Sequence, residues 1–100
     1  MHVLLPVDSC DASKASLTKI NDAKFWAQLL IREGRVSKMN FSVDRECFED
    51  FSEAVVVVDD GEYVWPFMEQ SMMVLVAHTQ RSIDDIVEAY LFKELNELAY

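Results

Sequence analysis

The sequence has little glycine, proline and cysteine, and its apolar runs are short. Only two residues of each of these three types occur among 100, while 51% of the residues are apolar. Disordered and collagen-like chains have the opposite composition, so both classes are excluded. The apolar runs fall far short of the roughly 20 residues of a membrane-spanning helix, so we expect no membrane insertion. A chain of this length supports one core, and we expect residues 1–100 to form a single domain.

Cysteine content and the amino terminus indicate an intracellular protein. The segment Met1–Val7 is apolar for only a few residues before Pro6 interrupts it, which is unlike a secretory signal peptide. Two cysteines, Cys10 and Cys47, are too few for a disulfide framework. We therefore expect free thiols and a cytoplasmic location.

Basic residues are scarce, and the negative charge is concentrated in the second part of the chain. The formal net charge is −9, from 18 acidic and 9 basic residues. Nucleic acid is excluded as a partner because phosphate binding needs a basic surface. Residues 1–43 carry six basic and four acidic residues, whereas residues 44–100 carry three and fourteen. This acidic part is either a solvated edge that keeps the protein soluble or a docking face for a basic protein partner.

The first part of the chain is predicted to form three strands. His2–Val7 is apolar on both faces, as in a buried strand, and the small polar residues 8–16 after it predict a long loop. Phe25–Ile31 and Val36–Val43 are rich in strand formers. Gly34 lies between them and supplies the positive φ of a tight turn, which predicts an antiparallel hairpin.

The second part is predicted to alternate helices and strands. Asp44 caps a short helix that extends through Cys47 and Phe48 to Phe51, and Ala54–Val58 is a central parallel strand because it is apolar throughout and β-branched at all four valines. A second helix within residues 62–70 begins near Trp65, because Pro66 fits only the first turn. Residues 72–77 form the last predicted strand.

A carboxyl-terminal amphipathic helix of about four turns completes the prediction. Ser82 is its cap and Asp85 lies in the capping-box position. Its apolar face consists of Ile83, Ile86, Val87, Tyr90, Leu91 and Leu98. The predicted fold is α/β: a mixed five-stranded sheet in the order β-β-β-α-β-α-β-α, with helices on both faces.

Four stretches follow the pattern of a known family: Met1–Asp8 as the opening strand, Ile20–Trp26 as a short motif with the strand after it, Arg32–Val36 as a hairpin turn, and Ser82–Leu95 as a terminal helix. In them the chain resembles the dinitrogenase iron–molybdenum cofactor biosynthesis family, whose fold is similar to the ribonuclease H-like architecture. The resemblance implies a cytoplasmic, non-enzymatic accessory protein related to nitrogen fixation. It also implies an iron–sulfur or iron–molybdenum cluster as the cargo.

The chain departs from the family pattern in its expected binding loops. Lys19 stands where the family has a motif histidine, and Asn21 stands where it has a glycine. Asp59 and Asp60 replace a glycine pair, with Gly61 one step later. A protonated lysine cannot ligate a metal, and the two carboxylates repel an anionic cluster at close range.

Cys10 and His78 are the candidate metal ligands. His78 follows a predicted strand at the sheet edge where α/β proteins place their sites, and Cys10 lies in the loop after the first strand. Together with Asp59 or Asp60 they compose a mixed thiol–imidazole–carboxylate set. Iron–sulfur clusters usually take four thiolates, and the alternative is that Cys10 and His78 are ordinary packing and surface residues.

Enzymatic catalysis has no support in the motifs. The sequence has no nucleophile elbow, phosphate loop or His-Glu-x-x-His pattern. Asp8, Asp59 and Asp60 resemble the Mg²⁺-binding carboxylates of a ribonuclease H, but a nuclease also needs a basic groove. The alternative to a cluster carrier is a diverged protein-interaction module without cofactor, which uses the acidic face and the segment Trp65–Met73.

Overall fold

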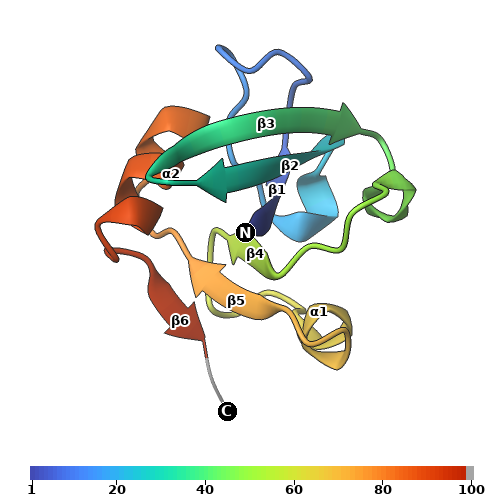
Figure 1. Cartoon of the computed structure of the whole chain (residues 1–100). Helices are drawn as coiled ribbons and strands as arrows, with labels where there is room; N and C mark the ends of the chain where they lie inside the picture. The colour runs from blue at the N-terminus through green and yellow to red at the C-terminus, as the bar shows by residue number, and fades with distance from the viewer. Residues whose placement is uncertain (99–100) are drawn as a thin grey trace.

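The described residues, 1–98 of the computed structural model, form a mixed six-stranded sheet with an α-helix on each face (Figure 1). The strands are β1 (His2–Val7), β2 (Phe25–Arg32), β3 (Arg35–Ser42), β4 (Ala54–Val57), β5 (Met73–Val76) and β6 (Asn96–Leu98). The helices are α1 (Trp65–Glu69) and α2 (Ile83–Leu91), and two 3-10 turns are η1 (Ile20–Asp22) and η2 (Arg45–Cys47). In this part of the chain no helix is long and apolar enough to cross a membrane.

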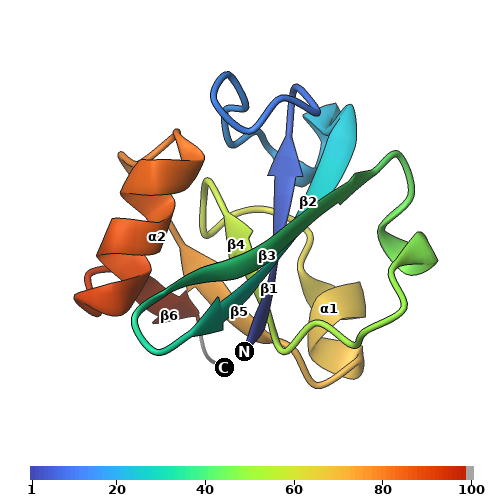
Figure 2. The same ribbon diagram turned by 45° about the horizontal axis from the view of Figure 1, so that its top comes forward.

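The centre of the sheet is parallel and its two edges are antiparallel. The strand order is β3-β2-β1-β4-β5-β6, in which β4 pairs in parallel with both β1 and β5. All four residues of β4 are fully buried, which confirms the prediction of a central parallel strand. The carboxyl ends of β1, β4 and β5 therefore point to one edge of the sheet, toward the top in Figure 2.

The predicted hairpin is confirmed. Arg32 pairs with Arg35, which leaves a two-residue turn made by Glu33 and Gly34. Both residues have positive φ, 53° and 79°, as a turn that matches the twist of the flanking strands requires. The alternation in β3 places Met39 and Phe41 against the core on one face.

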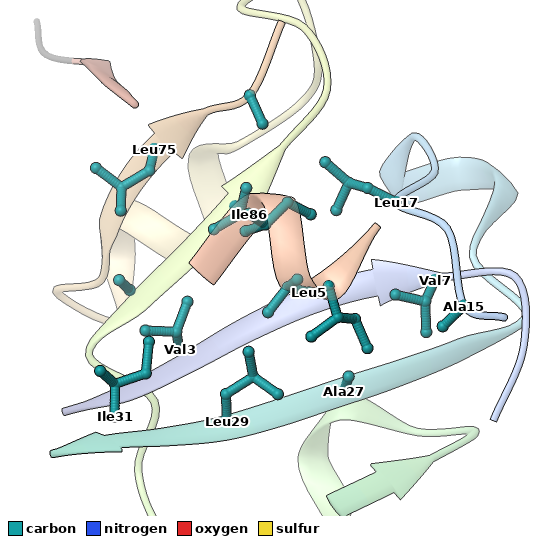
Figure 3. Close-up of a cluster of buried hydrophobic side chains, with 14 residues drawn as sticks. Val3, Leu5, Val7, Ala15, Leu17, Ala27, Leu29, Ile31, Leu75 and Ile86 are labelled. Carbon is teal, nitrogen blue, oxygen red and sulfur yellow. The ribbon is translucent and has the colours of Figure 1, made fainter. Parts of the chain in front are cut away.

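Side chains alternate between two cores, one on each face of the sheet. Figure 3 shows the core under α2, where Ile86 lies over Leu5 of β1 and Leu29 of β2. The opposite core lies under α1, where the rings of Trp26 and Phe67 meet at 5.9 Å between centroids. Successive residues of β4 contribute to these two cores in turn, because side chains along a strand point to opposite faces.

The five-strand prediction was wrong, because the terminal helix is shorter than expected. α2 begins after the Ser82 cap, whose hydroxyl accepts the Asp85 N–H at 3.1 Å as predicted, but it ends at Leu91. Lys93 then adopts a positive φ of 58°, and the chain turns back to form β6. Leu98 pairs with Val74 of β5 and packs in the core under α1 rather than on the apolar face of α2. Pairing with β6 gives the backbone groups on the edge of β5 their hydrogen-bond partners, which they would lack if these residues continued the helix.

The predicted helix after Asp44 was also wrong. Asp44 does cap, since its carboxylate accepts the Glu46 N–H at 2.9 Å, but only the three-residue turn η2 follows. Phe51 is 58% exposed, so the apolar spacing that suggested a helix does not correspond to a buried face. The predicted start of α1 at Trp65 is confirmed, with Pro66 in its first turn.

Removal of the Ile86 side chain tests the core under α2. Ile86 is 1% exposed, so we expect Ile86→Ala to lower the free energy of unfolding by about 2–5 kcal/mol and Ile86→Val by about 0.5–1.5 kcal/mol. Urea unfolding measures both values. A loss below about 1 kcal/mol for the alanine variant would show that α2 is not packed as described.

Candidate functional site

Four of the five predicted binding-loop residues come together at the carboxyl edge of the parallel strands. Lys19, Asn21, Asp59 and Gly61 line one cavity of about 350 Å³. The remaining lining residues are Ile20, Glu62 and Tyr63. Two chain segments build this site: η1, which follows the loop after β1, and the turn that follows β4. The fifth residue, Asp60, lies in the same turn between Asp59 and Gly61.

The segment from β1 to η1 is held by backbone hydrogen bonds to two neighbouring elements. The Thr18 N–H donates to the Pro6 carbonyl at 2.9 Å, and the Leu17 N–H donates to the Arg81 carbonyl at 2.7 Å. Leu17 is buried in the core under α2. Lys19 and Asn21 are therefore carried on a segment anchored by its own backbone and by a core residue.

Loop 8–16 itself is closed by side-chain hydrogen bonds. The Asp8 carboxylate accepts the Ser16 N–H at 2.9 Å, which joins the two ends of the loop. The Asp11 carboxylate accepts both the hydroxyl (2.8 Å) and the N–H (3.0 Å) of Ser13, and these two bonds lower the pKa of Asp11. Cys10 is exposed on this loop.

Glu62 binds three backbone N–H groups at the carboxyl end of β4. One carboxylate oxygen accepts the Ile20 N–H at 2.6 Å, across 42 positions of sequence. The other oxygen accepts the N–H groups of Val58 at 2.8 Å and Asp59 at 3.1 Å. The carboxylate therefore connects η1 to the turn after β4, and it holds amide donors from both walls of the cavity.

Asp59 closes the same turn. Its carboxylate accepts the Gly61 N–H at 2.8 Å. This bond is the largest cause of a lowered pKa for Asp59, followed by a side-chain bond to Asp60 and by the positive fields of Lys19 and His78. Gly61 does not have positive φ, and an added Cβ would lie 3.4 Å from an Asp59 carboxylate oxygen, an ordinary contact. The contribution of Gly61 at this turn is therefore its N–H group.

The structure does not assemble the proposed metal ligands into a site. Within residues 1–98, no group of three or more His, Cys, Asp or Glu side chains is placed so that it could hold a metal ion. Cys10, Cys47 and His78 are all exposed. His78 lies close enough to Asp59 to act on its charge, whereas His2 is near Asp50 and Glu53, at 3.4 and 3.8 Å.

The segment Trp65–Met73 is divided between core and surface. Phe67 and Met72 are buried in the core under α1, where a methionine side chain fills irregular gaps. Trp65 is 50% exposed and Met73 is 37% exposed, and Tyr63 beside the cavity is 70% exposed. The exposed aromatic ring of Tyr63 thus borders the turn of Asp59, Asp60 and Gly61, which we call the acidic turn.

Sequence reasoning missed Glu62, which was assigned only to the region of a short helix. The signal that was available is its spacing. A glutamate five positions after the last residue of a buried strand, in the run Asp59-Asp60-Gly61-Glu62, can return its carboxylate to the amides at that strand end. The partner of its other oxygen, Ile20, is too distant in sequence to be inferred from spacing.

The sequence matches no family model and no curated protein, but several solved structures share the fold. The crystal structure of PH0822 has a TM-score of 0.72 at 15% identity, covering 98% of this chain and 96% of that one. The crystal structure of MJ0327 from Methanocaldococcus jannaschii, described as a "putative dinitrogenase", has a TM-score of 0.76 at 12% identity, covering 99% and 95%. An NMR structure of the same protein has a TM-score of 0.72 at 14% identity, covering 100% and 94%. At these identities the likeness shows the fold alone.

Acid titration tests the charge environment of Asp59. Because its pKa lies below the ordinary value of 3.8, the charged carboxylate stabilises the fold above that pH, and this contribution is lost as the pH falls through the lowered pKa. We expect the wild-type protein to lose more unfolding free energy between about pH 6 and pH 2 than Asp59→Asn, which keeps an acceptor for Gly61. Urea unfolding at each pH measures the difference. Identical pH profiles would contradict the assignment.

Proposed function

We propose that this protein is a non-enzymatic accessory protein, a diverged member of the dinitrogenase iron–molybdenum cofactor biosynthesis family with a ribonuclease H-like fold. The support is the likeness of the whole described chain to the fold of a dinitrogenase-named protein, together with the sequence resemblance in four stretches. We place the protein in the cytoplasm, where its two exposed cysteines would stay reduced.

Within this role, the chemistry of the carboxyl edge favours a basic protein partner over an anionic cluster. The amides of Val58, Asp59 and Gly61 are already bonded to carboxylates of the chain itself, so a cluster would meet carboxylates where it needs donors. Cys10 is the one thiol on the loops at this edge, and clusters usually need four. The residues present therefore fit an anionic cluster poorly.

The acidic turn and the aromatic side chains beside it compose the proposed docking face. Asp59 and Asp60 are exposed, the exposed Tyr63 lines the same cavity as Asp59, and the half-exposed Trp65 follows two residues later in the chain. A carboxylate pair with neighbouring aromatic rings suits a partner segment rich in lysine or arginine, through ion pairing and cation–π contact. The observation that carries this proposal is the occupation of the amides by Glu62 and Asp59.

Anaerobic reconstitution with iron, sulfide and molybdate tests the cluster. We expect background metal content and no charge-transfer absorption, and no difference between the wild-type protein and Cys10→Ser. Cys47→Ser, as the control thiol, and His78→Ala, as the second proposed ligand, are reconstituted in the same way. Absorption that is present in the wild-type protein and in Cys47→Ser, but lost in Cys10→Ser and His78→Ala, would support a cluster carrier and contradict our preference.

Charge reversal tests the docking face. The double variant Asp59→Lys/Asp60→Lys should lose at least tenfold in affinity for basic partners captured from the host lysate, and the loss should shrink at high salt. The matched control is Glu49→Lys/Glu69→Lys, two exposed acids outside the turn with the same charge change. Equal capture by both double variants would show that the acidic turn is not the docking face.

A further inference from the structure

We propose that the N–H groups of Ile20, Val58 and Asp59 form a carboxylate-binding cradle, which this protein keeps closed with its own Glu62. The cradle is a site for a small monocarboxylate, and the Glu62 side chain is its resident occupant. This inference does not depend on the proposed function, because it rests only on the geometry of the turn after β4.

The cradle has the arrangement that a carboxylate needs. Two N–H groups from successive residues, Val58 and Asp59, converge on one oxygen at 2.8 and 3.1 Å, and the Ile20 N–H meets the other oxygen at 2.6 Å. Both oxygens of a planar carboxylate are therefore engaged, from two segments far apart in sequence. Successive amides of this kind make an anion-binding concavity, and bonds to a charged acceptor are stronger than neutral ones.

The donors belong to well-fixed backbone. Val58 directly follows β4, whose four residues are fully buried and paired with β5, the first two of them also with β1. Ile20 begins η1, and the preceding chain is tied to β1 through the bond from the Thr18 N–H to the Pro6 carbonyl. The cradle is therefore built by the fold, and removal of the Glu62 side chain should leave the donors facing the same point.

The surroundings select the size and charge of the occupant. Asp59, Asp60 and Lys19 lie near the cradle, so an anion with two charges meets net repulsion, whereas a single carboxylate charge replaces the one that Glu62 provides. In Glu62→Ala the missing heavy atoms are the Cγ methylene carbon and the carboxylate group. Acetate supplies a methyl group and a carboxylate, and it binds slightly farther out because its methyl group is not bonded to the remaining Cβ.

Acetate rescue of Glu62→Ala tests the cradle directly. The matched control is Glu69→Ala, which removes an exposed acid of α1 with the same change in net charge. We expect the thermal midpoint of Glu62→Ala to lie roughly 5 °C or more below that of the control. Sodium acetate should raise it by roughly 5–10 °C at ten times the dissociation constant, relative to equal sodium chloride, and above that constant the rise should follow the logarithm of the acetate concentration. The wild-type protein and Glu69→Ala should show no rise beyond that in sodium chloride.

Two results would overturn the proposal: a wild-type protein that responds to acetate as strongly as Glu62→Ala, or a folded Glu62→Ala whose thermal midpoint rises no more in acetate than in sodium chloride. If Glu62→Ala does not fold, Glu62→Gln provides the comparison, since it keeps the side-chain length and one acceptor oxygen. Glu62→Gln should be less stable than the wild-type protein in urea, and acetate should not restore it because the glutamine side chain still fills the cradle. Equal stability of the two proteins would show that no carboxylate is needed in the cradle.

Discussion

Backbone amides at the end of a buried parallel strand must find acceptors, and this requirement organises the functional edge of the molecule. β4 is buried on both faces and paired on both sides, so the chain leaves it with N–H groups that have no sheet partner. An unpaired N–H group costs about 1–3 kcal/mol where it is buried, and less where water reaches it. Glu62 supplies the acceptor for the half-buried Val58 N–H and the exposed Asp59 N–H, and its second oxygen accepts the Ile20 N–H of η1.

The same contact decides what the edge presents to other molecules. A turn whose amides were free would be a place for anions, at the sheet edge where α/β proteins often bind ligands. Here the amides are taken up internally, and the outward groups are the carboxylates of Asp59 and Asp60. Compared with a turn whose amides are free, this edge therefore repels anions instead of attracting them, although the strands that support it are the same. This reversal is the physical basis for preferring a basic protein partner over an anionic cluster.

The central fold was predictable from sequence because its signals are local. The run of valines in β4, the glycine turn between β2 and β3, and the Ser82 cap of α2 each identify an element from a few adjacent residues. β6 was not predictable, since its formation depends on pairing with β5 and the residues before it continue the helical pattern. The turn η2 shows the same limit: Asp44 signals a cap, but nothing local shows that the apolar residues after it have no core to face.

The candidate site was predictable in part. Loop positions after β1 and β4 follow from the strand order, and four of the expected residues do line one cavity. The role of Glu62 was not predictable, because its longest-range bond joins residues 42 positions apart. From the sequence, carboxylates at such a turn predict only repulsion of an anionic ligand. In the structure, Asp59 and Glu62 also act as hydrogen-bond acceptors for backbone N–H groups.

Amide hydrogen exchange of the wild-type protein, resolved by residue with NMR, directly tests whether the Glu62 carboxylate binds the three N–H groups of the cradle. If the Glu62 carboxylate holds the cradle closed, the amides of Ile20, Val58 and Asp59 exchange slowly although Asp59 is exposed and Ile20 and Val58 are only half-buried. All three amides should be protected from exchange together, with one shared free energy for opening of the cradle. Exchange of these amides at the rate of an unstructured peptide would contradict it.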